Sequence, residues 1–254
     1  MELLQSNSGH YYYSEGRGNP IVFLHGFPDC PENYKDQLSF FASKGYQALV
    51  PYMPGYHPED KDLDTYQSVR IAEDIIGFIE SVTDQPIILI GHDWGSSVSY
   101  AIAGIRPDLV KRLISISVPH GLSVGTAFLS DAEQQRKSWY MFFFQLEIAD
   151  IAVPFNNFNF IERLWTDWSP NWPEYKEYAN ATQIKIDSKK HLASNDGNGN
   201  KYGFILQNPK QLRIPIPCTG QLNFFEFKPE LTKINEIKTE LFEEEHRYMW
   251  INHH

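Results

Sequence analysis

Short apolar segments alternate with segments of helical periodicity over the first half of the chain, and this alternation constrains the fold more than any other feature. Four segments, residues 21–24, 46–52, 86–90 and 110–118, read as buried strands. Strands covered on both faces are apolar throughout, whereas strands with one wet face alternate with polar residues. The pattern therefore predicts an α/β fold in which helices cover both faces of a mostly parallel sheet.

Helices are predicted in the segments between these strands. The clearest lies between residues 69 and 79, where apolar residues recur at the i, i+3, i+4 spacing of one buried face. These residues are Val69, Ala72, Ile75, Ile76, Phe78 and Ile79. Two further helices are predicted, one ending near Lys44 and one, rich in Ala and Ser, over residues 96–105.

The pattern changes between about residues 121 and 200, where buried-strand segments give way to frequent aromatic residues. These are Trp139, Tyr140, Phe142, Phe143, Phe144, Trp165, Trp168 and Trp172. The α/β pattern returns at residues 214–218. We therefore expect residues 1–120 and 206–254 to form one α/β core, and residues 121–205 to form a helical, aromatic cap.

Charge and cysteine content exclude several classes of function. The 22 Lys and Arg residues against 32 Asp and Glu residues give a net charge of −10, which argues against binding to nucleic acid. Cys30 and Cys218 are too few for a disulfide framework and suit a reducing compartment, so a cytoplasmic location is expected. No apolar run approaches the roughly 18 residues that would span a membrane, and no membrane contact is expected.

The strongest local signal is the segment Gly91-His92-Asp93-Trp94-Gly95, which follows a predicted strand and opens a predicted helix. It has the form of the nucleophile elbow G-x-S-x-G, with Asp93 at the position of the serine. Glycines are required on both sides because the turn is too tight for Cβ atoms there. The alternative interpretation is an ordinary sharp turn in which Asp93 serves as a helix N-cap.

A carboxylate in such an elbow has a defined chemistry. The partial positive charge at a helix N-terminus keeps Asp93 ionised. The carboxylate would attack an electrophilic carbon and form an ester with it. Ser96 and Ser97 lie beyond the elbow and are poor candidates for a nucleophile.

These motifs resemble those of the α/β-hydrolase superfamily, in particular the epoxide hydrolase and haloalkane dehalogenase branch that uses an Asp nucleophile. The segment His25-Gly26-Phe27-Pro28 looks like the HGxP motif of that branch, and the resemblance extends over nearly the whole chain. It implies an oxyanion hole formed by the backbone N–H groups of Phe27 and Trp94, and it implies that no cofactor is required.

The aromatic segment Ser138–Gln145 resembles the first cap helix of epoxide hydrolases. That resemblance places Tyr140 where a family tyrosine gives its phenolic proton to the epoxide oxygen, because ring opening develops an alkoxide. Tyr202 is the candidate for a second such tyrosine, although its spacing to the next strand is short for the family. For both residues the alternative is a packing role. The cap aromatics predict a small, apolar substrate.

Haloalkane dehalogenation is the alternative reaction with the same nucleophile. Halide-binding relatives usually carry Asn after the HG pair, where this chain has Phe27, and fluoroacetate dehalogenases typically carry Arg where this chain has Trp94. Both differences favour an epoxide as the electrophile.

The chain departs from the family pattern at the residues that hydrolyse the ester. The resemblance places the orienting acid at Asn223, which is an amide, and the base at His246, which follows Glu245 instead of the usual glycine. An amide can orient an imidazole but cannot stabilise its cation by charge. We therefore expect Asp93 to be alkylated and its ester to be hydrolysed slowly, and a ligand-binding relative without turnover is the alternative from a different class.

Two further expectations concern partners and metals. Only eight residues follow His246, so the final helix of the family is missing and a homodimer could cover the exposed sheet face. No His or Cys cluster has the spacing of a metal site, and no metal is expected.

Overall fold

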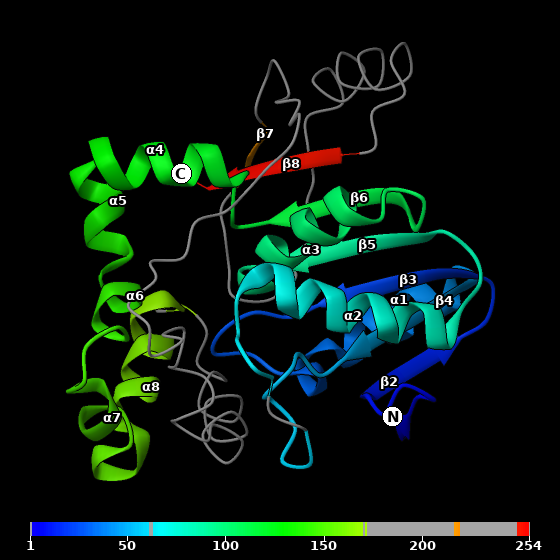
Figure 1. Ribbon diagram of the computed structural model, residues 1–254, viewed down its shortest axis with the longest axis horizontal. Coiled ribbons are helices and arrows are strands. Elements are labelled where there is room, and N and C mark those ends of the chain that lie inside the picture. Colours follow the sequence, from blue (N-terminus) through cyan, green and yellow to red (C-terminus); the bar gives the residue numbers. More distant parts are fainter. Residues whose placement is uncertain (1, 61–62, 170, 172–215, 219–247, 254) are drawn as a thin grey trace.

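The computed structural model describes residues 2–60, 63–169, 171, 216–218 and 248–253, and these ranges form a twisted sheet with helices around it (Figure 1). Within them, no helix is long and apolar enough to cross a membrane.

Eight strands form the sheet in the order β1-β2-β4-β3-β5-β6-β8-β7. Their bounds are β1 Leu3–Gln5, β2 Tyr11–Gly16, β3 Asn19–Leu24, β4 Tyr46–Pro51, β5 Ile87–His92, β6 Val110–Ile116, β7 Ile216–Cys218 and β8 Tyr248–His253. Along the sheet from β4 to β7, neighbouring strands pair in parallel. This confirms the parallel pairing predicted for the apolar segments, whereas β8 was not predicted. The hairpin of β1 and β2 pairs antiparallel with β4 and was not predicted, so the sheet is mixed.

Alternate residues of the central strands pack on opposite faces of the sheet. In β3, Val22 and Leu24 belong to the core cluster that contains the apolar face of α2, whereas Ile21 and Phe23 belong to the cluster that contains Leu38 of α1. All four β3 side chains are fully buried. Helices therefore cover both faces, which confirms the predicted α/β architecture.

The helices of the core lie close to their predicted positions. Their bounds are η1 Pro31–Tyr34, α1 Lys35–Ser43, α2 Ser68–Val82 and α3 Trp94–Ile105. The helix α3 begins two residues earlier than predicted, because it starts directly after Asp93 with no intervening loop.

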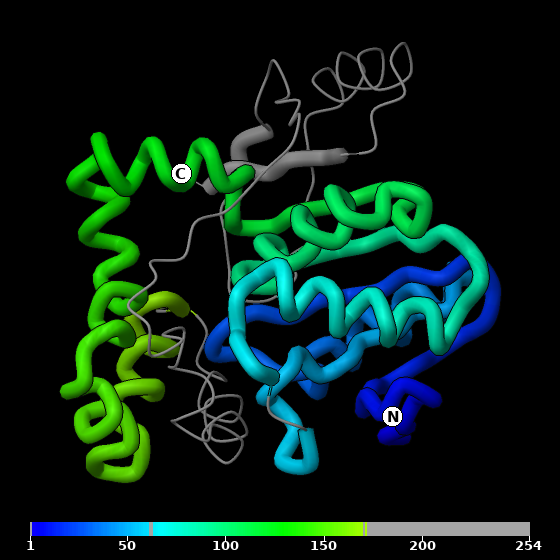
Figure 2. The backbone as a smooth tube through the Cα atoms, in the orientation of Figure 1, coloured from blue at the N-terminus to red at the C-terminus, as the bar shows by residue number. Residues whose placement is uncertain are grey.

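After β6 the chain leaves the sheet and forms a helical arm beside it (Figure 2). The helices of this arm are α4 Gly121–Ser130, α5 Ala132–Lys137, α6 Trp139–Phe143, α7 Ala149–Ala152 and α8 Phe155–Trp168. Ile161, Leu164 and Trp165 form a small buried cluster there, and Phe27 of the core packs against it. The arm thus has an apolar centre of its own that meets the core near Phe27.

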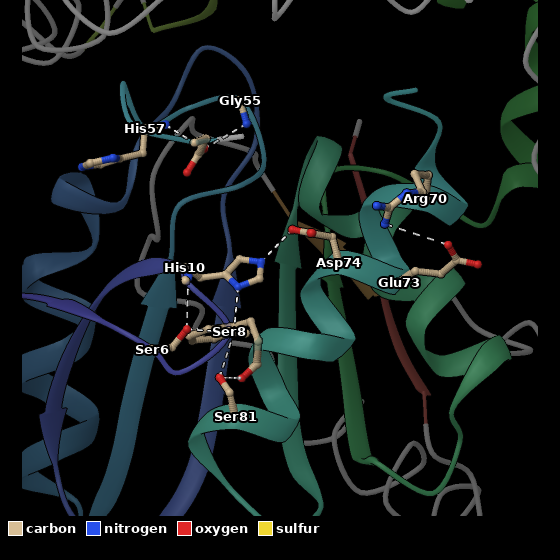
Figure 3. Close-up of polar contacts among 12 residues, drawn as sticks. Ser6, Ser8, His10, Gly55, His57, Arg70, Glu73, Asp74 and Ser81 are labelled. Atoms are coloured by element: carbon tan, nitrogen blue, oxygen red, sulfur yellow. Dashed lines mark hydrogen bonds and ion pairs between the residues drawn. The ribbon is translucent and has the colours of Figure 1, made fainter. Parts of the chain in front are cut away.

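A polar network holds the β1–β2 hairpin against α2 (Figure 3). Nε2 of His10 lies 2.6 Å from Oδ2 of Asp74 on α2, and its Nδ1 lies 2.9 Å from Oγ of Ser8. Ser8 in turn donates to Oγ of Ser81 at 3.0 Å. These contacts tie the corner of the sheet to the middle and end of one core helix.

Candidate active site

Asp93 stands at the junction of β5 and α3 in a strained backbone conformation. Its φ of 51° and ψ of −118° are rarely adopted by a residue with a side chain. Asp93 occupies the N-cap position of α3, but its side chain makes no capping hydrogen bond. This geometry agrees with the predicted elbow and excludes the simple N-cap alternative, because the carboxylate is directed elsewhere.

Glycines surround the elbow where the backbone leaves no room for a side chain. A Cβ atom on Gly95 would overlap the carbonyl oxygen of Leu24, and one on Gly91 would overlap the carbonyl oxygen of Gly95. A Cβ on Gly26 would collide with the side chain of Asp93 itself. The three glycines therefore allow β3, β5 and α3 to converge on one carboxylate.

The carboxylate of Asp93 accepts hydrogen bonds from two backbone N–H groups. The N–H of Phe27 donates to Oδ1 at 2.8 Å, and the N–H of Trp94 also donates to this carboxylate. Burial raises the pKa of Asp93 above its usual value, and the two N–H donors oppose this shift. The two N–H groups that the resemblance assigns to an oxyanion hole thus lie directly at the predicted nucleophile.

His25 holds the loop that carries Phe27. The N–H of Met53 donates to Nε2 of His25 at 3.0 Å, so the proton of the neutral ring is assigned to Nδ1, which lies 3.1 Å from the carbonyl oxygen of Gly26. The imidazole is fully buried. His25 is therefore a support for the loop.

Tyr140 of α6 lies close to the elbow. Its ring stacks against Phe27, with 6.5 Å between ring centroids, and meets Trp168 edge-on at 4.7 Å. Burial, followed by the charge of Asp93, raises the pKa of the Tyr140 phenol well above its usual value. Among the described residues its hydroxyl has no hydrogen-bond partner. The phenol is therefore protonated and able to donate its proton.

A second buried carboxyl group, Asp29, belongs to the same region and was missed by the sequence analysis. Its side chain is 1% exposed, and one of its oxygens, Oδ2, has no hydrogen-bond partner among the described residues. The available signal was its position directly after the His25–Pro28 motif, but the sequence does not show that this loop is buried.

Three predicted site residues, Tyr202, Asn223 and His246, lie outside the described residues. The strand β8 begins two residues after His246 and pairs in parallel with β6. Because β5 and β6 are also parallel, His253 at the end of β8 lies at the same edge of the sheet as Asp93.

Within the described part of the chain, no group of three or more His, Cys, Asp or Glu residues is arranged to hold a metal ion. The chemistry available at the site is that of a buried carboxylate, two backbone N–H donors and a protonated phenol.

The family model for the alpha/beta hydrolase fold matches residues 19–160, more than half of the chain, and the protein belongs to this family.

The chain is similar to several curated proteins. It is 35% identical over 149 residues to the AB hydrolase superfamily protein YfhM of Bacillus subtilis, which covers 58% of this chain and 52% of that protein. It is 30% identical over 160 residues to Epoxide hydrolase 2 of Caenorhabditis elegans, and this match covers 61% of this chain and 45% of that protein. The chain thus spans about half the length of the curated relatives that it matches.

Solved structures of epoxide hydrolases share the fold. The enzyme from Bacillus megaterium, crystallised with an inhibitor, superposes with a TM-score of 0.66 at 22% identity, over 85% of this chain and 81% of that one. The enzyme from Vigna radiata superposes with a TM-score of 0.59 at 22% identity, over 76% of this chain and 68% of that one. The chain is an epoxide hydrolase-like α/β hydrolase by fold.

Proposed function

We propose that this protein is a hydrolase that opens a small apolar epoxide to a vicinal diol through an ester on Asp93. The observation that carries the proposal is the placement of Asp93 in a strained elbow, with the N–H groups of Phe27 and Trp94 on its carboxylate. Curated relatives named epoxide hydrolases support the choice of electrophile.

In the first step, a carboxylate oxygen of Asp93 attacks an epoxide carbon and the ring C–O bond breaks. The alkoxide that forms takes the proton of Tyr140, whose hydroxyl has no competing acceptor among the described residues. An apolar wall of Phe27, Phe144 and Trp168 around this phenol favours an uncharged substrate.

In the second step, water attacks the carbonyl carbon of the ester, and the oxyanion receives hydrogen bonds from Phe27 and Trp94. The two N–H groups already hold a carboxylate oxygen in the resting protein, so they need no rearrangement. The resemblance assigns the base of this step to a histidine. The candidate is His246, which lies outside the described residues.

The amide at Asn223 leaves such a histidine without the carboxylate that normally stabilises its cation. A comparable Asp→Asn change in a serine protease lowers turnover by about 10⁴-fold. We therefore propose that a histidine acting alone hydrolyses the ester slowly.

The proposal is tested by assaying a panel of small epoxides and haloalkanes for diol and for halide. We expect diol from an apolar epoxide, no halide, and loss of both product and covalent adduct in Asp93→Asn. Halide release would assign the dehalogenase reaction instead. Binding of the epoxide without diol or adduct, unchanged in Asp93→Asn, would show a ligand-binding protein and overturn the proposal.

A further inference from the structure

The β1–β2 hairpin lies at one edge of the sheet, and the side chain of His10 links its turn to α2 (Figure 3). The strand β1 has three residues and, within the described sheet, pairs only with β2. Short edge elements open at a lower free energy than central strands. Side-chain contacts between the turn and α2 therefore influence how often this hairpin opens.

The imidazole of His10 has a partner at each of its two nitrogens. Nε2 lies 2.6 Å from Oδ2 of Asp74, and Nδ1 lies 2.9 Å from Oγ of Ser8. A carboxylate only accepts hydrogen bonds, so the proton between His10 and Asp74 is assigned to Nε2. The state of Nδ1 depends on whether the hydroxyl of Ser8 can donate to it.

The hydroxyl of Ser8 belongs to a chain of three serines that ends on α2. Its Oγ lies 2.8 Å from Oγ of Ser6 and 3.0 Å from Oγ of Ser81. Ser81 donates in turn to the carbonyl oxygen of Phe78 at 2.7 Å. These three contacts and the two contacts of the imidazole make a network of five contacts between the turn and α2.

A neutral imidazole does not supply enough protons for this network. Each of the five contacts needs one proton between its two heavy atoms. The three hydroxyl groups supply three protons and a neutral imidazole supplies one, so one contact is left without a proton. A protonated imidazole supplies two, and all five contacts are then hydrogen bonds.

The charged groups near His10 are Asp74 of α2 and Asp60 of the segment after β4. Arg70, one turn before Asp74 on α2, pairs with other carboxylates. Burial raises the pKa of Asp60, and the positive charge of His10 is among the interactions that lower it. Among the described residues, no cation therefore competes with the imidazole for Asp74.

We propose that His10 is a pH-sensitive fastener, which holds the hairpin against α2 when the imidazole is protonated and loosens it when the imidazole is neutral. Imidazole is the side chain that ordinarily changes its charge between about pH 5 and 8. Loss of its proton leaves one contact of the network unmade and removes the attraction to Asp74. The closed hairpin is therefore stabilised at the lower pH, and this stabilisation is lost as the pH rises. The inference is independent of the reaction proposed at Asp93.

The test measures amide hydrogen exchange of residues 3–13 in the full-length protein between about pH 5.5 and 8, corrected for the intrinsic exchange rate at each pH. We expect the protection of these amides to fall by about 2- to 5-fold relative to β5 as the pH rises, the size expected of a partly exposed ion pair. His10→Gln has no titrating ring and should remove this change. His57→Gln removes a histidine that stacks on Tyr11 of the same hairpin and should keep it.

Two serine variants test the proton count itself. Ser81→Ala removes two contacts and one hydroxyl proton, so a neutral imidazole suffices for the contacts that remain. Its pH dependence should fall below about 2-fold. Ser6→Ala removes one of the five contacts and one proton, so the shortage persists. This matched control should loosen the turn at every pH, because the N–H of His10 loses its acceptor, and should keep the wild-type pH dependence.

Constant protection of the wild-type hairpin over this pH range, or an unchanged pH dependence in His10→Gln, would overturn the fastener. Equal pH dependence in Ser81→Ala and Ser6→Ala would overturn the proton count. Nitrogen NMR of the His10 ring in the wild-type protein needs no variant. We expect the fully protected hairpin to coincide with a ring protonated at both nitrogens, and equal protection around a neutral ring would also overturn the proposal.

Discussion

Asp74 and Asp93 are both held by short hydrogen bonds, but one lies at the corner of the sheet and the other at the carboxyl ends of its parallel strands. Asp74 is 25% exposed and faces the imidazole of His10. Asp93 is buried beside two backbone N–H donors, and its negative charge raises the pKa of a second buried carboxyl group, Asp29. We therefore expect the contact between His10 and Asp74 to be structural, and the buried carboxylate of Asp93 to be available for attack on an electrophile.

The largest expected effect separates these two aspartates by activity. Asp93→Asn removes the nucleophile and should lower kcat by at least about 10⁴-fold, as loss of a nucleophile does in other hydrolases. Asp74→Asn should leave kcat within about 2-fold of wild type. Steady-state diol formation measures both, and comparable loss in the two variants would contradict the difference drawn between the sites.

The next expected effect is on the pH dependence of the free energy of unfolding. The folded-state pKa of Asp29, about 7, lies above its usual value of 3.8, so the folded protein binds the extra proton. The bound proton contributes fully to the free energy of unfolding below about pH 4, and this contribution is lost as the pH rises to 7. The loss amounts to about 3–4 kcal/mol. Urea unfolding of wild type and Asp29→Asn from pH 4 to 8 measures it. An equal slope in both proteins would show that Asp29 is not the group concerned.

A smaller effect, on stability, is expected from the packing around Gly95 at the elbow, and Gly104 in the same helix provides the control. Gly95→Ala would force a Cβ atom into the Leu24 carbonyl oxygen and should destabilise the protein by about 3 kcal/mol or more. Gly104→Ala lies in the same helix, α3, with open space around its Cβ position, and should stabilise the protein by about 0.5–1 kcal/mol. Thermal unfolding compares them, and destabilisation of similar size would show that the helix rather than the elbow is sensitive.

The hydroxyl of Tyr140 should affect turnover and have little effect on stability. Tyr140→Phe should lower kcat by about 10²-fold or more, because the alkoxide loses its proton donor, with little change in Tm. Tyr12→Phe, in β2 where the ring packs edge-on against Phe78 of α2, is the matched control. Unchanged kcat in Tyr140→Phe would assign this tyrosine to packing.

The smallest expected effect is the contribution of the contact between His10 and Asp74 to stability. A double-mutant cycle of His10→Ala and Asp74→Ala should give a coupling energy of about 0.5–1 kcal/mol, since both side chains are partly exposed to solvent. Urea unfolding of the two single variants and the double variant measures the coupling. A value above about 3 kcal/mol would contradict the view that this pair only fastens the hairpin.

The sequence predicted those parts of the fold in which local pattern and burial coincide. The strand Ile87–His92 and the elbow at Asp93 follow from an apolar run and a short glycine motif, because each imposes its own geometry. The hairpin of Leu3–Gln5 and Tyr11–Gly16 was missed, since its three consecutive tyrosines lack a period-2 pattern. Its antiparallel pairing depends on a contact with β4, which is distant along the chain.

The residues of the site also fall into two groups, those identified from local motifs and those that were not. Phe27, Trp94 and Tyr140 were identified from motifs. The N–H groups of Phe27 and Trp94 lie at Asp93, and the charge of Asp93 acts on the Tyr140 phenol. Asp29 could not be identified, because a polar residue in a loop shows no sign of burial in the sequence. Tyr202, Asn223 and His246 lie outside the described residues, so their roles and the extent of the cap stay predictions.

The central claim, an ester on Asp93, is tested most directly by turnover of an epoxide in water enriched in ¹⁸O. Water that attacks the ester carbonyl carbon leaves its oxygen in the Asp93 carboxylate and releases the original carboxylate oxygen in the diol. After several turnovers, peptide mass spectrometry should find ¹⁸O in the peptide that contains Asp93. Label in the diol from the first turnover, with none in that peptide, would show direct attack of water on the epoxide and would contradict the account.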